Sequence, residues 1–384
     1  MNDTILLCIF ENPVKKQKHI PLSAPDLDPV PDEFDWQVDD KSQISGFEKD
    51  LSKLARVPYV TTTQSGTAAI HLALILLEIG QGDEVICQSF TFAGTAFPIL
   101  YQGASPVFID SERDSWNMDP ELLEEAIIDR KRITGRFPKA IIPVHLFGSP
   151  AKMDEILSIA SKYEIPVVED AAEALGSVYQ DQACGSFGDL GIYSFNSNKI
   201  ITTSGGGAIL SRNNNLIEKA RYLANQAKDP GDHLEHKSLG FNYRMSHINA
   251  GIGRIQIKVL DDRIKKRRSI FDFYRERLKE IPGLTFQPEL PQAFSNRWLS
   301  VVEIDGLDVK KNNELRSLLK NEGIEVRPAW KPLHQQTVFQ SFMSYINGIS
   351  DDICDKSICL PSGSSLQISD LERVTEVLLS AWNK

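Results

Sequence analysis

The sequence predicts an α/β fold in which a largely parallel sheet is followed by a smaller α+β part. Helical periodicity, for example over 153–160, separates several short apolar runs, and strands that alternate with helices form a parallel sheet covered on both faces. The apolar runs lie at 84–88, 106–109, 139–146, 165–169 and 190–195. A chain of 384 residues is also long enough for two domains.

The N-terminal part combines an irregular stretch with the first buried elements. Residues 11–45 are polar and rich in proline, which predicts an irregular arm over 1–45. The segment 66–79 is apolar nearly all round, which is typical of a buried helix. The turn at 80–83 then leads into the strand at 84–88. We expect a large domain over 46–250.

A long helix and a smaller domain are expected over 251–384. After Met245 the apolar residues Ile248, Ile252, Ile255 and Val259 form one helical stripe, and Pro282-Gly283 ends the pattern. The remaining segments predict a short α+β unit. Its expected elements are a strand at 297–304, a helix at 309–321, a strand at 324–327 and a closing helix from Asp370.

Composition excludes several classes of protein. Hydrophobic residues make up 41% and charged residues 24%, as in ordinary globular proteins, and the net charge of −10 argues against a nucleic-acid surface. The five cysteines have no metal-type spacing and an odd count, so we expect no metal site, no disulfide framework and a cytoplasmic protein. The apolar run at 5–10 is too short for a signal peptide or a membrane span, so no membrane partner is expected.

Lys199 and Asp170 are the main candidates for chemistry. Lys199 follows an aromatic, β-prone segment and precedes a triple glycine, a setting that suits a reactive amine. Asp170 ends an apolar run, where a buried carboxylate needs a cationic partner. Pyridoxal 5'-phosphate needs such a pair, because a lysine binds its aldehyde as a Schiff base and a carboxylate keeps its ring nitrogen protonated. Taken singly, Lys199 could also be an ordinary surface lysine and Asp170 a structural carboxylate.

Further residues have types that suit the rest of this cofactor. Gly66 and Thr67 begin the buried helix, where free N–H groups bind phosphate, although the same residues suit an ordinary helix cap. Phe92 follows the next strand and is placed either to stack on a planar ring or to pack in the core. Glu173 lies three residues after Asp170, within reach of the ring's 3-hydroxyl. In this order the residues predict bound pyridoxal 5'-phosphate.

Five motifs together closely resemble the DegT/DnrJ/StrS family of sugar aminotransferases, which are fold-type I pyridoxal-phosphate enzymes. The resemblance covers most of the chain, from about Ile20 onward. The motifs are Gln64-Ser-Gly-Thr-Ala-Ala, Gly82-Asp-Glu-Val-Ile, Pro143-Val-His-Leu-Phe-Gly148, Glu169-Asp-Ala-Ala-Glu-Ala-Leu-Gly176 and Ser194-Phe-Asn-Ser-Asn-Lys199.

The resemblance implies a mostly parallel seven-stranded sheet and a homodimer whose active sites are shared between subunits. It also implies that Gly66, Thr67 and Ser194 hold the phosphate, Phe92 stacks on the ring, Asp170 pairs with the ring nitrogen and Lys199 is the Schiff-base lysine. In the family, the motif Gly240-Phe-Asn242-Tyr-Arg244-Met sends its asparagine to the phosphate of the neighbouring subunit's cofactor. Without the resemblance, Asn242 would be interpreted as a turn residue.

The resemblance further implies the reaction. Related enzymes with histidine in place of the lysine remove a sugar hydroxyl, so Lys199 indicates transamination. The run from Asn196 to Gly207 is most similar to enzymes that use L-glutamate to aminate C4 of a UDP-4-keto-6-deoxy-N-acetylhexosamine for surface glycans. Two alternatives are a GDP-4-keto-6-deoxymannose aminotransferase of the perosamine type and a non-catalytic regulatory member that binds the cofactor.

A second segment resembles the family's substrate side. Its candidate residues are Arg327, Trp330, Lys331 and His334, whose charges suit a diphosphate and whose indole suits a sugar or base, and a structural role is the alternative for each. Asn296-Arg297-Trp298 is a weaker candidate of the same kind. Between Leu22 and Phe47 the chain is shorter than many relatives, and this part of the family's pocket often touches the sugar.

Overall fold

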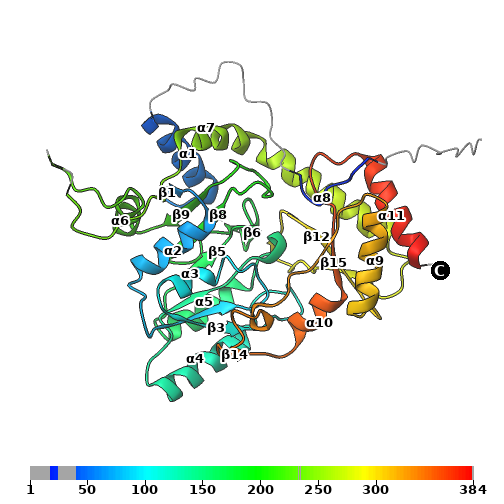
Figure 1. Cartoon of the computed structure of the whole chain (residues 1–384), viewed down its shortest axis with the longest axis horizontal. Helices are drawn as coiled ribbons and strands as arrows, with labels where there is room; N and C mark the ends of the chain where they lie inside the picture. The colour runs from blue at the N-terminus through cyan, green and yellow to red at the C-terminus, as the bar shows by residue number, and fades with distance from the viewer. Residues whose placement is uncertain (1–17, 25–39, 232, 234, 383–384) are drawn as a thin grey trace, which may run out of the picture.

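The computed structural model describes residues 18–24, 40–231, 233 and 235–382. Figure 1 shows a large sheet with its helices, coloured blue to green except for an orange edge strand at 344–345, beside a smaller C-terminal part coloured yellow to red. The apolar run at 5–10 and most of the expected arm lie outside the described residues. Within the described part of the chain, no helix combines the length and apolar character that a bilayer span requires.

The large sheet is mostly parallel, as predicted, but it has eight described strands, because the two-residue edge strand β14 adds to the seven that were expected. Its two halves are β1-β9-β8-β5 and β4-β2-β3-β14, and bridges from Ile141 to Val167 and from Val144 to Asp170 join them. Among the described strands of this sheet, β9 alone runs antiparallel to its neighbours. The strands are β1 (Tyr59–Thr63), β2 (Glu84–Gln88), β3 (Ser105–Ile109), β4 (Ala140–Ile142), β5 (Val168–Asp170), β8 (Leu190–Ser194), β9 (Gly207–Ser211) and β14 (Ser344–Tyr345).

Helices cover both faces of this sheet, because successive strand residues point to opposite sides. On β2, Val85 and Cys87 pack with α2, α3 and α6, whereas Ile86 packs with α4 and α5. The helices are α1 (Asp40–Ala55), α2 (Gly66–Leu76), α3 (Phe97–Tyr101), α4 (Pro120–Thr134), α5 (Met153–Lys162), α6 (Asn214–Ala224) and α7 (His247–Gln256).

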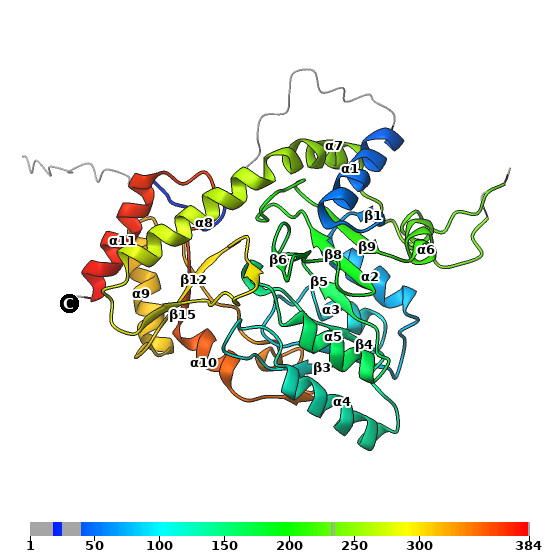
Figure 2. The same ribbon diagram turned by 180° about the vertical axis from the view of Figure 1, so that it is seen from behind.

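The C-terminal part is built on an antiparallel sheet in the order β10-β12-β15-β13. Figure 2 shows the long helix α8 running from the large sheet to this part, where α9 and α11 pack beside it. These elements are α8 (Leu260–Arg277), β10 (Leu284–Phe286), β12 (Ser300–Ile304), α9 (Val309–Asn321), β13 (Arg327–Pro328), α10 (Ile349–Lys356), β15 (Ser357–Leu360) and α11 (Ile368–Trp382). Residues 18–24 join it through a parallel bridge between Ile20 and Ile324.

Short elements complete the described chain. A small three-stranded sheet has the order β11-β6-β7, and three single turns of 3₁₀-helix punctuate the loops. These elements are β6 (Val178–Tyr179), β7 (Gln182–Ala183), β11 (Ala293–Phe294), η1 (Leu146–Gly148), η2 (Ile257–Val259) and η3 (Leu333–Gln335).

Three sequence-based expectations need correction. The arm expected to be irregular through residue 45 is helical from Asp40, because α1 packs closely on α7: a Cβ at Gly253 would come within 2.5 Å of the Phe47 ring. The strand expected at 324–327 is reduced to Arg327–Pro328. The long helix expected after Met245 is interrupted by the 3₁₀ turn η2.

The apolar stripe of α7 also faces an unexpected direction. The side chain of Ile248 is 40% exposed, whereas the buried positions of this helix are Ala250, Gly251, Gly253 and Gln256. The stripe therefore lies away from the core of its own chain.

Candidate active site

A cavity of about 370 Å³ lies at the carboxyl ends of the parallel strands, where open α/β sheets bind their ligands. It is walled by the turn after β1, the loop after β2, the ends of β5 and β8, and two tryptophans of the C-terminal part. Eight of the main candidate residues line it together, and Trp298 of the weaker candidate segment at 296–298 lines it as well. The eight are Gly66, Thr67, Phe92, Asp170, Glu173, Ser194, Lys199 and Trp330.

Lys199 reaches into this cavity from the turn that follows β8. Its Nζ lies 3.1 Å from Oε1 of Glu173 and 4.1 Å from the ring centroid of Trp298. Both side chains are largely buried, and burial raises the pKa of Glu173. The other carboxylate oxygen of Glu173 accepts the N–H of Phe147 at 2.8 Å, so the position of the carboxylate is fixed.

Asp170 ends β5 and is only 4% exposed. Its Oδ2 accepts the hydroxyl of Thr95 at 2.8 Å, and its Oδ1 accepts the N–H of Ala172 at 3.1 Å. Among the described residues, no side-chain cation lies within ion-pair distance of it. Burial is the main cause of the raised pKa of this carboxyl group.

These features fit pyridoxal phosphate. A buried carboxylate without a cationic partner suits a protonated ring nitrogen at its open side. At the start of α2 the N–H of Ala68 is capped by the Ser65 hydroxyl, whereas the N–H groups of Gly66 and Thr67 precede the first helical hydrogen bond and suit a phosphate. A Cβ at Gly66 would come within 3.0 Å of the Ser194 Cβ, so the absence of a side chain keeps this cradle open.

Phe92 and Trp330 form the outer wall of the cavity. Their ring centroids lie 5.8 Å apart, and Phe92 remains 63% exposed within this single chain. Phe92 therefore has a free face that a planar ligand or a second subunit can cover.

Four predicted residues do not line the cavity. Asn242 is exposed, between Phe241 and Tyr243, whose rings pack near His71 on α2. The other three lie at the start of β13 or in the segment that follows it: Arg327 is exposed and bonds Glu325, Lys331 is exposed, and His334 contacts Ser89 Oγ at 2.7 Å and Asp351 at 3.1 Å. Their functional roles remain predictions.

Thr95 was not found from the sequence. Its hydroxyl bonds Asp170 and also lies 3.0 Å from the hydroxyl of Thr91. The link depends on the sheet order, in which β2 and β5 flank β4, and no local pattern near Thr95 signals it.

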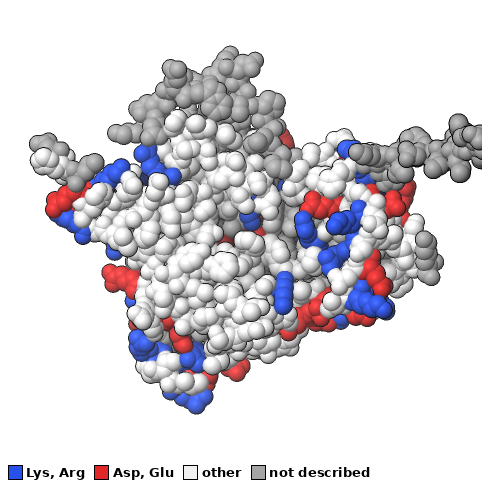
Figure 3. All heavy atoms as spheres, viewed as in Figure 1, with Lys and Arg blue, Asp and Glu red and all other residues white. Residues whose placement is uncertain are grey.

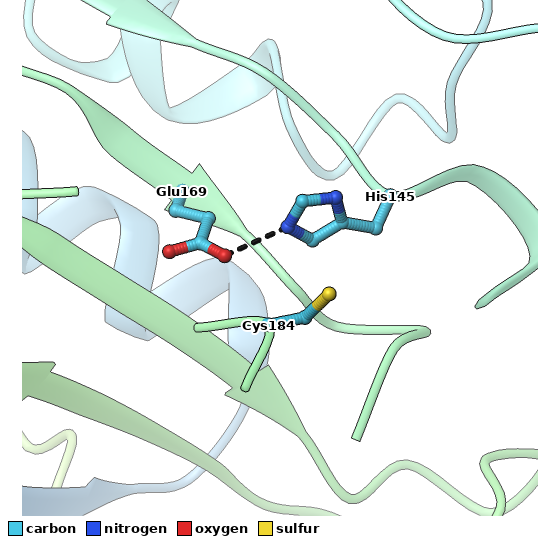
Figure 4. Close-up of side chains that lie close together, drawn as sticks. All are labelled: His145, Glu169 and Cys184. Atoms are coloured by element: carbon cyan, nitrogen blue, oxygen red, sulfur yellow. Dashed lines mark hydrogen bonds and ion pairs between the residues drawn. The ribbon is translucent and has the colours of Figure 1, made fainter. Parts of the chain in front are cut away.

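A second buried polar cluster lies beside Asp170 and consists of His145, Glu169 and Cys184 (Figure 4). The Nε2 of His145 lies 2.7 Å from Oε1 of Glu169, and its Nδ1 accepts the N–H of Ala151 at 3.0 Å. Glu169 also accepts the backbone N–H groups of residues 185, 187 and 188. Because these bonds already engage the histidine nitrogens and both carboxylate oxygens, the cluster ties the chain together behind β5 and is poorly suited to bind a metal ion.

Comparison with known proteins agrees with this geometry. Residues 33–379 match the model of the DegT/DnrJ/EryC1/StrS aminotransferase family. A Bacillus subtilis (strain 168) protein named "Putative pyridoxal phosphate-dependent aminotransferase EpsN" is 50% identical over 345 residues, which cover 88% of each chain. The GDP-perosamine synthase of Escherichia coli O157:H7 is 33% identical over 356 residues, 91% of this chain and 94% of that one. The crystal structure of a DegT DnrJ EryC1 StrS aminotransferase from Brucella abortus superposes with a TM-score of 0.83 at 30% identity, covering 89% of this chain and 91% of that one.

Proposed function

The chain belongs to the DegT/DnrJ/EryC1/StrS aminotransferase family and is a pyridoxal-phosphate-dependent sugar aminotransferase, and we propose that it transfers the amino group of L-glutamate to C4 of a UDP-linked 4-keto-6-deoxy sugar. The observation that carries the proposal is the placement of Lys199 and Asp170 in one cavity. The aminated sugar would serve the assembly of a surface glycan.

The predicted cofactor residues that line the cavity have distinct roles in this proposal. Pyridoxal phosphate, when bound, supplies an aldehyde carbon that takes up the amino group and a ring that delocalises negative charge. Asp170 holds the proton on the ring nitrogen, since its carboxylate is buried and open on one side. Gly66, Thr67 and Ser194 hold the phosphate at the start of α2, and Phe92 covers one face of the ring.

Lys199 is the proposed proton carrier. With the cofactor bound, the uncharged Nζ would take the proton released at Cα of the amino donor and deliver it to the aldehyde carbon of the cofactor, and in the second half of the reaction it would work in the reverse direction. Glu173, 3.1 Å away, keeps the Nζ within the cavity between these transfers. This role requires a side chain long enough to reach both carbon atoms while its backbone stays in place.

The choice of a UDP-linked 4-keto sugar rests on the segment that carries the lysine. Asn196, Asn198 and Lys199 line the cavity, and the run that contains them most resembles enzymes that aminate C4 of UDP-linked sugars. A GDP-linked 4-keto-6-deoxy sugar is the second candidate, favoured by the 33% identity to GDP-perosamine synthase. We propose that Arg327, Lys331 and His334 contact the diphosphate, because they lie in the same segment as the cavity-lining Trp330 and their charges suit phosphate groups.

We also propose that the enzyme is a homodimer with shared sites. The surface over α2 and α3 carries few charges (Figure 3), and large apolar side chains are exposed near it, including Leu239 at 81% and Tyr101 on α3 at 58%. Phe241 and Tyr243, stacked with ring centroids 5.0 Å apart, hold Asn242 on the outside of the chain. An exposed asparagine on such a support can reach the cofactor phosphate of a second subunit.

The sugar specificity is tested with a panel of UDP- and GDP-linked 4-keto-6-deoxy sugars. Purified enzyme receives L-glutamate or L-glutamine with each sugar, and the amino-sugar product is followed by mass spectrometry, with Lys199→Ala as the inactive control. The proposal expects the highest kcat/KM for a UDP-linked N-acetylated sugar with glutamate. A clear preference for the GDP-linked sugar would overturn the UDP assignment in favour of the second candidate.

The shared site is tested by mixing subunits. Lys199→Ala and Asn242→Asp are each expected to be inactive alone, the latter because its carboxylate repels the phosphate. In a random mixture half of the dimers are mixed, and each mixed dimer contains one intact site, so activity should recover to about a quarter of wild type. No recovery, with mixed dimers demonstrated, would show that each subunit builds its site alone.

A further inference from the structure

We propose that Trp298 is a further positioning residue of this site, whose indole face docks Nζ of Lys199 and holds the amine in the cavity while it carries a proton. The inference rests on the proposed role of Lys199. It assigns a function to a tryptophan that the cofactor chemistry does not otherwise require.

The contact has the geometry of a cation–π interaction. Nζ of Lys199 lies 4.1 Å from the centroid of the Trp298 ring, well within the range of about 6 Å over which such pairs attract. The ring is 2% exposed, so water does not screen the contact. Glu173 approaches the same nitrogen at 3.1 Å, which gives the amine an anionic and an aromatic partner.

The two partners differ in what they do with a proton. The Glu173 carboxylate can accept the proton of the amine, since burial raises its pKa. An indole face attracts the ammonium group and has no lone pair in the ring plane to take its proton. Trp298 therefore stabilises the protonated lysine while leaving the proton on Nζ for delivery.

Trp298 is itself held rigidly against the lysine turn. Its Nε1 donates to the carbonyl of Asn198 at 2.8 Å, its backbone N–H donates to Asn296 at 2.9 Å, and its carbonyl accepts a bond from the buried Arg267. The Asn198 carbonyl also accepts the hydroxyl of Ser23 at 3.1 Å, and Arg267 donates to that hydroxyl at 3.2 Å. The carbonyl of Asn198, which precedes Lys199, is thus fixed by two donors from outside the large sheet, the Trp298 indole N–H and the Ser23 hydroxyl.

The test measures the reactivity of Lys199 in the cofactor-free protein. The apoprotein is treated with cyanate, and carbamylation of Lys199 is followed by peptide mass spectrometry relative to the exposed Lys320. Trp298→Leu should raise the relative rate about two- to thirty-fold, because only the uncharged amine reacts and the ring no longer stabilises the charged form. Trp298→Phe, which keeps an aromatic face, should stay within about threefold of wild type.

A matched control separates docking from packing. Trp116 is buried to the same extent, does not line the cavity, and its replacement by leucine should leave the Lys199 ratio unchanged while lowering stability. An unchanged ratio in folded Trp298→Leu would overturn the proposal.

If Trp298→Leu does not fold, fluorotryptophan replaces the five tryptophans instead, which preserves their shape and weakens the attraction of the ring for a cation. A rate that rises with the number of fluorine atoms supports docking, and a flat response contradicts it. Failure of the Lys199 assignment itself is recognised separately, as unimpaired turnover in Lys199→Ala.

Discussion

Replacement of Asp170 by asparagine should have opposite effects on the empty protein and on cofactor binding. The carboxyl group is buried and its pKa is raised, so the folded protein holds the proton to higher pH than the unfolded chain does. At neutral pH the ionised group therefore lowers the free energy of unfolding. The asparagine can accept the N–H of Ala172 and donate to Thr95 without a buried charge.

The structure sets the expected size of both effects. Removing the desolvated charge should raise the free energy of unfolding of the apoprotein by about 1–3 kcal/mol. Losing a charge-assisted hydrogen bond to the ring nitrogen is worth about 1.5–3 kcal/mol, which corresponds to a Kd for pyridoxal phosphate about 10- to 150-fold higher. The two quantities are measured by urea unfolding of the apoprotein and by absorbance titration with the cofactor.

Asp110 provides the matched control. It is a buried aspartate just after β3, and it accepts backbone N–H groups of Ser111, Asn347, Gly348 and Ser350. Asp110→Asn should destabilise the protein, because the amide places its own N–H groups against these donors, and should leave the Kd unchanged. The reasoning is refuted if Asp170→Asn destabilises the apoprotein by more than 1 kcal/mol while binding the cofactor as tightly as wild type.

Three further expectations follow from the same geometry. Burial raises the pKa of both Asp170 and Glu173, so the free energy of unfolding of the apoprotein should fall as pH rises from about 4 through these raised pKa values. The double variant D170N/E173Q lacks both carboxyl groups and should show a shallower fall in urea titrations. Gly66→Ala should weaken cofactor binding at least tenfold, since the new Cβ crowds Ser194, and should change the free energy of unfolding by no more than about 1 kcal/mol. An affinity equal to that of wild type would show that the phosphate binds elsewhere. Glu169→Gln should lower the free energy of unfolding by about 1–3 kcal/mol with no change in Kd or in response to a chelator, and loss of a bound metal ion would contradict this structural role.

Much of the fold was predictable because the local periodicity of apolar residues determines where most helices and strands form. The expected helix at 309–321 is observed as Val309–Asn321, and the expected strand at 84–88 as Glu84–Gln88. The start of α1 was not predictable in this way. Its first turns are polar and follow a proline-rich segment, and the helix forms where Phe47 packs against α7, a contact that no local pattern encodes.

The candidate site was predictable at those positions where the residue type alone requires a charged or reactive partner. A carboxylate at a strand end and a lysine before a triple glycine signal chemistry in the sequence, and both line the same cavity. Thr95 gave no signal and Trp298 was only a weaker candidate, because a threonine and a tryptophan have many structural uses. Their contacts with Asp170 and Lys199 depend on the strand order and on how the C-terminal part meets the large sheet.

The position of the cofactor bond tests the account most directly. Enzyme loaded with pyridoxal phosphate is reduced with borohydride and digested, and the peptides are sequenced by mass spectrometry to find the pyridoxyl group. We expect the group on Lys199 and no labelling in Lys199→Ala. A pyridoxyl group on another lysine, with Lys199 unmodified in fully active enzyme, would contradict the central claim.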